Sequence, residues 1–77
     1  MKDFIEKIVL SILESDNFKI IEEKQENLLI YTILVSEEEI GKIIGKDGKV
    51  INSIRTLCRV KATKIQEKIL LKVDKLP

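Results

Sequence analysis

The sequence predicts an α+β fold in which a small three-stranded sheet packs against helices in a layered arrangement. Three observations support this class. Apolar residues recur at helical spacing near the N-terminus, two strand-forming stretches follow, and two further helical stretches precede a final apolar strand. The 77 residues have room for one core, and no linker, repeat or low-complexity segment divides them. We therefore expect a single domain over residues 1–77.

The first predicted element is an amphipathic helix from Asp3 to about Ser15. Its apolar stripe consists of Phe4, Ile5, Ile8, Val9, Ile12 and Leu13. Asp3 and Glu6, three residues apart, form a candidate capping box. Asn17 is expected to take the left-handed conformation that ends the helix. Leu10 lies off the stripe, on the polar side, and is a candidate contact for a partner.

A β-hairpin is predicted next. Residues 18–26 form its first strand, and the chain turns near Glu26 and Asn27. The second strand, residues 28–35, reads LLIYTILV, and its β-branched and aromatic content makes it the clearest strand in the chain.

Two helices joined by glycines follow the hairpin. The first is predicted from Glu37 to about Ile44, with Ser36 as N-cap and Glu39 completing a capping box. The sequence GKDG then interrupts the helical pattern, because glycine disfavours a helix and readily adopts turn conformations. The second helix is predicted over residues 49–62, with the buried face Val50, Ile51, Ile54, Leu57 and Cys58.

The last predicted element is a strand from Ile65 to Val73. The complete order is therefore helix, strand, strand, helix, helix, strand, or α-β-β-α-α-β.

Basic residues are concentrated around the glycines. The stretch from Lys42 to Lys64 holds seven basic residues and one acid, a local charge of +6, whereas the rest of the chain has a charge of −5. The basic residues are Lys42, Lys46, Lys49, Arg55, Arg59, Lys61 and Lys64, and the acid is Asp47. A glycine turn that opens a helix N-terminus among cations favours a phosphate ligand. A solvated helix face is the alternative interpretation of such a charge run.

The composition argues against an enzyme and against a metal or cofactor site. There is no histidine, Cys58 is the only cysteine, and Ser53 has no evident base. Cys58 also falls on an apolar helix face, where a small core residue is the expected role. Neither the P-loop pattern nor the dinucleotide-binding glycine pattern is present.

Residues 43–54, IIGKDGKVINSI, resemble the signature of the KH domain. Two aliphatic residues precede G-x-x-G, and further aliphatic residues follow three and six positions after the second glycine. The matching residues are Ile43, Ile44, Gly45, Gly48, Ile51 and Ile54. The element order resembles the type II arrangement of this fold, with a three-stranded mixed sheet packed on helices. The whole chain is similar to the small single-domain bacterial KH proteins of the KhpA family.

The resemblance implies a protein that binds single-stranded RNA in a groove and acts as an RNA chaperone or post-transcriptional regulator. In KH domains the G-x-x-G loop clamps the backbone of about four nucleotides. The implied RNA-binding residues are Lys42, Ile44, Gly45, Lys46, Asp47, Gly48, Lys49, Ile51 and Arg55. Ile44 and Ile51 would help to form an aliphatic floor for the bases, and the charge of Asp47 would weaken phosphate binding. The chain has few aromatic residues, which fits an aliphatic groove better than a base-stacking surface.

The resemblance also implies self-association or pairing with a larger KhpB-type KH protein, and the exposed sheet face is a candidate contact. The N-terminal stretch carries charges inside its apolar run, which excludes a signal-peptide core and a membrane span. We therefore expect a cytoplasmic protein.

Two other functions remain open from the residues alone. A helix-turn-helix DNA-binding protein would use Asn52, Ser53, Arg55 and Thr56 as its recognition surface. A protein-interaction module would have the KH shape without any nucleic-acid role.

Overall fold

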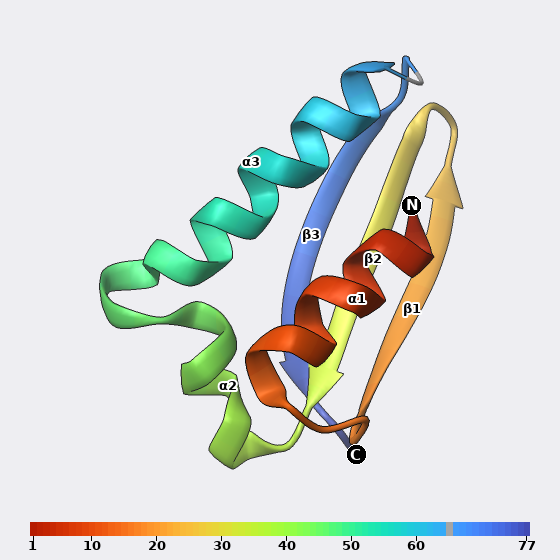
Figure 1. Ribbon diagram of the computed structural model, residues 1–77. Coiled ribbons are helices and arrows are strands. Elements are labelled where there is room, and N and C mark those ends of the chain that lie inside the picture. Colours follow the sequence, from red (N-terminus) through yellow and green to blue (C-terminus); the bar gives the residue numbers. More distant parts are fainter. Residues whose placement is uncertain (65) are drawn as a thin grey trace.

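The computed structural model describes residues 1–64 and 66–77, and it confirms the predicted α-β-β-α-α-β order (Figure 1). The elements are α1 (Lys2–Leu13), β1 (Phe18–Gln25), β2 (Leu28–Val35), α2 (Glu37–Ile44), a 3₁₀ turn (Lys46–Gly48), α3 (Lys49–Lys64) and β3 (Lys68–Lys75). Ile65, where the last strand was predicted to begin, lies outside the described residues. Strand β3 begins at Lys68 and continues two residues beyond the predicted end at Val73.

The three strands form a mixed sheet in the order β1-β2-β3. β1 and β2 are antiparallel, with Phe18 opposite Val35, and the two-residue turn between them falls at Glu26 and Asn27 as predicted. β2 and β3 are parallel. A parallel pair needs a crossover connection, which α2 and α3 supply. All three helices lie on the same face of the sheet (Figure 1).

The core lies between this helical layer and the sheet. It comprises Ile5, Val9, Leu13, Ile20, Leu29, Tyr31, Ile33, Val35, Ile43, Ile51, Ile54, Cys58 and Leu71. Alternate residues of β2 contribute to it, as expected for a strand covered on one face. Lys61 of α3 lies over the ring of Phe4, with 4.5 Å between its Nζ and the ring centroid, which connects α3 to α1.

Leu57 does not belong to this core, although it was predicted on the buried face of α3. Its side chain is 50% exposed. Ala62, one turn beyond Cys58 on the buried stripe of α3, is buried instead. The prediction was wrong because the buried stripe of α3 is narrow and centred on Ile54 and Cys58, so a residue three positions from Ile54 lies at its margin.

The predicted ends of α1 were also incorrect. Met1 is the N-cap residue and no side chain caps this end, so the Asp3–Glu6 capping box does not form. At the other end, Glu14 adopts the left-handed conformation (φ 54°), and its N–H donates to the carbonyl of Leu10 at 2.8 Å. The helix therefore ends before the position predicted for Asn17.

Ser36 is the N-cap residue of α2, as predicted, but the capping box has a different geometry. The Ser36 hydroxyl donates to the Glu39 carboxylate at 3.0 Å, and its carbonyl accepts from the N–H of Glu39 at 2.9 Å. The side chain of Ser36 makes no cap hydrogen bond to the backbone.

Within the described residues, no helix is long and apolar enough to cross a membrane.

Candidate nucleic-acid interface

The glycine loop joins α2 to α3 and turns the chain within four residues. Gly45 has φ 76° and ψ 175°, Asp47 has φ 56° and Gly48 has φ 75°, so three of the four residues have positive φ. The N–H of Gly45 closes α2 by donating to the carbonyl of Gly41 at 2.8 Å, and the N–H of Gly48 donates to the carbonyl of Gly45 at 3.2 Å. Asp47 suits its place because aspartate tolerates the left-handed region better than most residues.

Gly45 is required by a close approach as well as by its backbone angles. A Cβ at this position would lie 2.4 Å from Cγ2 of Val50 and 2.9 Å from the Val50 backbone nitrogen. The loop therefore folds directly onto the first turn of α3. Gly48 is different, because a Cβ there would meet nothing closer than Nδ2 of Asn52 at 3.7 Å, and only its positive φ favours glycine.

Gly41 meets neither condition. It is exposed, and a Cβ there would have no neighbour within 4 Å. This glycine therefore does not allow a close approach of another helix.

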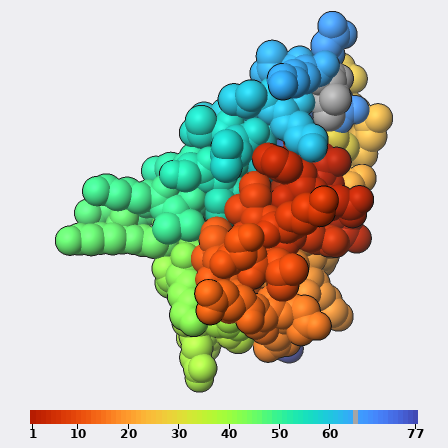
Figure 2. Space-filling view, in the orientation of Figure 1, coloured from red at the N-terminus to blue at the C-terminus, as the bar shows by residue number. Residues whose placement is uncertain are grey.

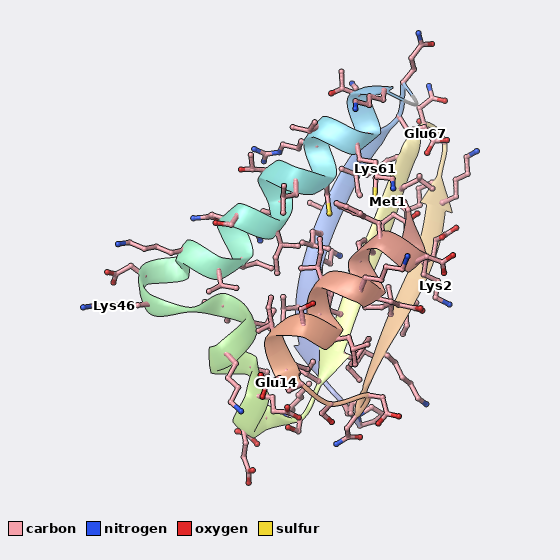
Figure 3. All side chains as sticks on the ribbon, in the orientation of Figure 1. Met1, Lys2, Glu14, Lys46, Lys61 and Glu67 are labelled. Carbon is pink, nitrogen blue, oxygen red and sulfur yellow. The ribbon has the colours of Figure 1, made fainter. Side chains whose placement is uncertain are left out.

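Three lysines surround the loop. Lys42, Lys46 and Lys49 are exposed, and the loop projects from the body of the molecule (Figure 2). The side chain of Lys46 points away from the protein at the tip of this projection (Figure 3). The N–H of Lys49, the first residue of α3, donates to the carbonyl of Lys46, and the dipole of this 16-residue helix adds partial positive charge next to these lysines. This arrangement is chemically suited to a phosphate.

The two aliphatic residues predicted to line the site have different surroundings. Ile44 is 37% exposed next to the loop, whereas Ile51 is 5% exposed and belongs to the core. Ile44 therefore offers most of the apolar surface at this position, and Ile51 mainly fixes α3 to the sheet.

Arg55 and Arg59 lie one helical turn apart on the side of α3 that faces β3. They line a hollow between the two elements together with Cys58, Ile69, Leu70 and Leu71. Arg55 is half-buried, and its guanidinium donates to Oδ1 of Asn52 at 3.3 Å. The sequence prediction assigned Arg55 to the site but did not assign Arg59 or strand β3, which line the same hollow. The i, i+4 spacing of the two arginines was the available signal, while the position of β3 depends on strand pairing.

The remaining basic residues of the run do not gather at the loop. Lys61 lies against Phe4 on the α1 side of the helix, and Lys64 ends α3 at the far end from Lys46. The charge run of the sequence therefore divides between the loop, the hollow beside β3 and two positions away from the loop.

The residues considered for catalysis or for reading duplex DNA have structural roles in α3. Cys58 is fully buried, and burial raises the pKa of its thiol, which disfavours the reactive thiolate. The hydroxyl groups of Ser53 and Thr56 donate to carbonyls one turn earlier in α3, at 2.9 and 3.0 Å. These donors are therefore occupied in the surface considered for duplex DNA.

Comparison with known proteins identifies relatives along nearly the whole chain. The sequence profile described as "KhpA/KhpB, KH domain" matches residues 2–73. A protein of Thermotoga maritima is 38% identical over 58 residues, covering 74% of this chain and 77% of its own. Proteins of Chlamydia trachomatis and Clostridium perfringens are 36% and 31% identical over 74 residues, covering 95% of this chain and 95% and 99% of their own.

All three relatives are bacterial and carry the name RNA-binding protein KhpA. The fold, the G-x-x-G loop between two helices and these matches agree, and the chain belongs to the KhpA/KhpB family of KH domains.

Proposed function

We propose that the protein binds single-stranded RNA, with the loop from Gly45 to Gly48 holding the phosphate backbone. The observation that supports this most directly is the projecting glycine loop, which places Lys42, Lys46 and Lys49 around the start of α3. The bases then lie along α3, over Ile44 and toward the hollow beside Arg55. The names of the relatives support RNA as the ligand.

We further propose that the protein acts in the cytoplasm as an RNA chaperone or post-transcriptional regulator. A single KH groove contacts few nucleotides, so pairing of two domains would raise the affinity for a longer RNA. A second copy of this chain, or a larger KhpB-type KH protein, is the proposed partner. The family description, which joins the two kinds of protein, supports this pairing.

Fluorescence anisotropy with labelled single-stranded RNA tests the RNA site. Gly48→Asp places a carboxylate in the loop where the structure leaves room for a Cβ, and Gly41→Asp, one turn before Gly45 in α2, is the matched control. We expect Gly48→Asp to abolish binding and Gly41→Asp to reduce it only slightly. For three or four neutralised phosphates, the slope of log affinity against log salt should be about −2 to −3.

Two results would contradict the proposal. Unchanged affinity in a folded Gly48→Asp protein would remove the loop from the site. A preference for duplex DNA over single-stranded RNA would favour the helix-turn-helix alternative.

A further inference from the structure

The face of the sheet opposite the helices carries an apolar strip along its central strand, β2. Alternate residues of β2, from Leu29 to Val35, belong to the core, so the residues between them point to the other face. These outward residues are Leu28, Ile30, Thr32 and Leu34. Ile21 of β1 and Leu70 of β3 flank the strip and are 42% and 41% exposed. No helix of the described residues covers this surface, which we call the outer sheet face (Figure 1).

The charged residues of the outer sheet face lie on its two outer strands. The register of the sheet places five of them there, namely Lys19 and Glu23 on β1 and Lys68, Lys72 and Asp74 on β3. All five are exposed. An apolar centre within a polar rim is the composition of a protein–protein interface. Three lysines and two carboxylates leave this face with a charge of only +1, which favours a partner of mixed charge over a nucleic acid.

The positions of these charges are complementary to a second copy of the same face. Each strand has eight residues, and β2 pairs with both neighbours over its full length. A two-fold axis parallel to β2 therefore places β1 over the partner's β3. Lys19 and Asp74 flank the same residue of β2, Leu34, on its two sides. In this arrangement Lys19 of each copy faces Asp74 of the other.

The second acid of the face also meets opposite charge in this arrangement. Glu23 and Leu70 flank Ile30, so Glu23 lies over the partner's Leu70, between the levels of the partner's Lys68 and Lys72. The uncharged β2 strands lie over each other at the centre. The symmetry thus brings both acids of each copy near lysines of the other.

We propose that the outer sheet face joins two copies of this chain into a dimer about a two-fold axis along β2. This inference rests on the self-association proposed above and assigns a surface to it. Two sheets packed face to face lie about 10 Å apart, and the side chains of their facing surfaces interdigitate. The helices of both copies lie on the outside, so both loops from Gly45 to Gly48 stay free for RNA.

The size of the outer sheet face predicts a weak dimer. Eight residues of strand measure about 27 Å and three strands about 14 Å, which gives a projected area of about 380 Å². A standard interface buries about 800 Å² on each partner. The dimer should therefore exchange with the monomer, and a long RNA that occupies both loops should stabilise it.

Exchange of the paired charges tests this geometry. In a dimer of either Lys19→Glu or Asp74→Lys, like charges face each other in both contacts. An equimolar mixture of the two variants restores opposite charges in both contacts of the mixed dimer. Sedimentation velocity at up to about 1 mM protein measures the association. The control is Lys7→Glu, which reverses an exposed lysine of α1 away from this face.

A second pair of variants tests the apolar strip. Ile21→Ser shortens an aliphatic side chain of the outer sheet face that is 42% exposed. Leu57→Ser is its matched control, because Leu57 is 50% exposed but lies on α3, on the other side of the sheet. Circular dichroism checks the fold of every variant.

We expect Lys19→Glu and Asp74→Lys each to weaken dimerisation about tenfold, and their mixture to associate about as tightly as wild type. Ile21→Ser should weaken dimerisation about three- to tenfold. Lys7→Glu and Leu57→Ser should associate like wild type.

Three results would overturn the outer sheet face as the interface. A wild type that stays monomeric over the whole range would refute self-association itself. A mixture no tighter than its separate components, or an equal loss in either control, would refute this surface for a protein that still self-associates. The loop site is tested separately, since all these variants should bind a labelled four-nucleotide oligouridylate like wild type. Failure of the wild type to bind that RNA would contradict the proposed RNA site and not the dimer.

Discussion

Replacing Gly45 by alanine should destabilise the protein far more than the same change at Gly48. Both glycines belong to the G-x-x-G sequence, which does not distinguish them, and both have positive φ in the structure. The structure distinguishes them, because only Gly45 is pressed against another part of the chain, the first turn of α3 at Val50.

The expected cost at Gly45 has two parts. Its backbone angles, φ 76° and ψ 175°, fall in a region that only glycine adopts freely, which costs another residue about 1–3 kcal/mol. A Cβ only 2.4 Å from Cγ2 of Val50 and 2.9 Å from the Val50 nitrogen also forces the loop to shift, at a further cost of about 1–3 kcal/mol. The total of about 2–6 kcal/mol is a large fraction of the roughly 5–15 kcal/mol that stabilises a typical domain. Gly48→Ala carries only the backbone cost, about 1–2 kcal/mol.

Urea denaturation followed by circular dichroism measures both free energies of unfolding by linear extrapolation. Gly41→Ala is the control without any predicted clash or backbone strain, and it should be neutral or slightly stabilising because alanine favours a helix. Equal losses at Gly45 and Gly48, or a loss below about 1 kcal/mol at Gly45, would refute the close packing of the loop on Val50.

Three further outcomes follow from the same structure. Asp47→Asn should bind single-stranded RNA about two- to fivefold more tightly in a filter-binding titration, because it removes a carboxylate and asparagine also tolerates the left-handed conformation; weaker binding would mean that the carboxylate contacts RNA favourably. Burial, followed by a hydrogen bond with Glu22, raises the pKa of Tyr31 to about 12. Because an unfolded tyrosine ionises near pH 10, this contribution to stability is complete below about pH 10 and is lost toward pH 12, by up to about 1.4 kcal/mol per pH unit. Urea titrations from pH 8 to 11 should therefore show a flatter decline for Tyr31→Phe than for wild type, and equal slopes would contradict the assignment. Leu57→Ala should cost less than about 0.5 kcal/mol in thermal unfolding whereas Ile54→Ala should cost about 2–5 kcal/mol, and similar costs would contradict the exposure of Leu57.

The order of elements could be predicted because each element carries its own periodic pattern. The stretch from Leu28 to Val35 has a composition that few helices share, and the GKDG sequence separates α2 from α3 by local chemistry alone. The helix ends could not be predicted in the same way. Asp3 has the residue type of an N-cap, yet the first turn already forms from Met1, and Glu14 takes the left-handed position that asparagine usually favours.

The loop and its lysines were likewise readable in the sequence, because a local turn brings them together. The hollow between α3 and β3 could not be predicted, because it lies between a helix and a strand whose relative position depends on the whole fold. Which residues of β3 lie beside Arg55 and Arg59 depends on the register of β3 against β2, from Leu28 opposite Lys68 to Val35 opposite Lys75. This register is a non-local property that no single segment encodes.

The separation of charge explains how the proposed phosphate site is compatible with a net charge of only +1. Charges at a protein surface act over a Debye length of about 8 Å at physiological salt. The molecule measures 34 Å along its longest axis, so most acidic residues are screened from the loop. Even Glu37 and Glu38 lie at the opposite end of the eight-residue helix α2, about 10 Å from Gly45. At the proposed site, a phosphate would therefore interact with Lys42, Lys46 and Lys49 and with Asp47 in the loop, rather than with the net charge. The same screening limits the attraction between these lysines and RNA phosphates to a short range. A single domain should therefore gain little affinity from any part of an RNA that does not lie along α3.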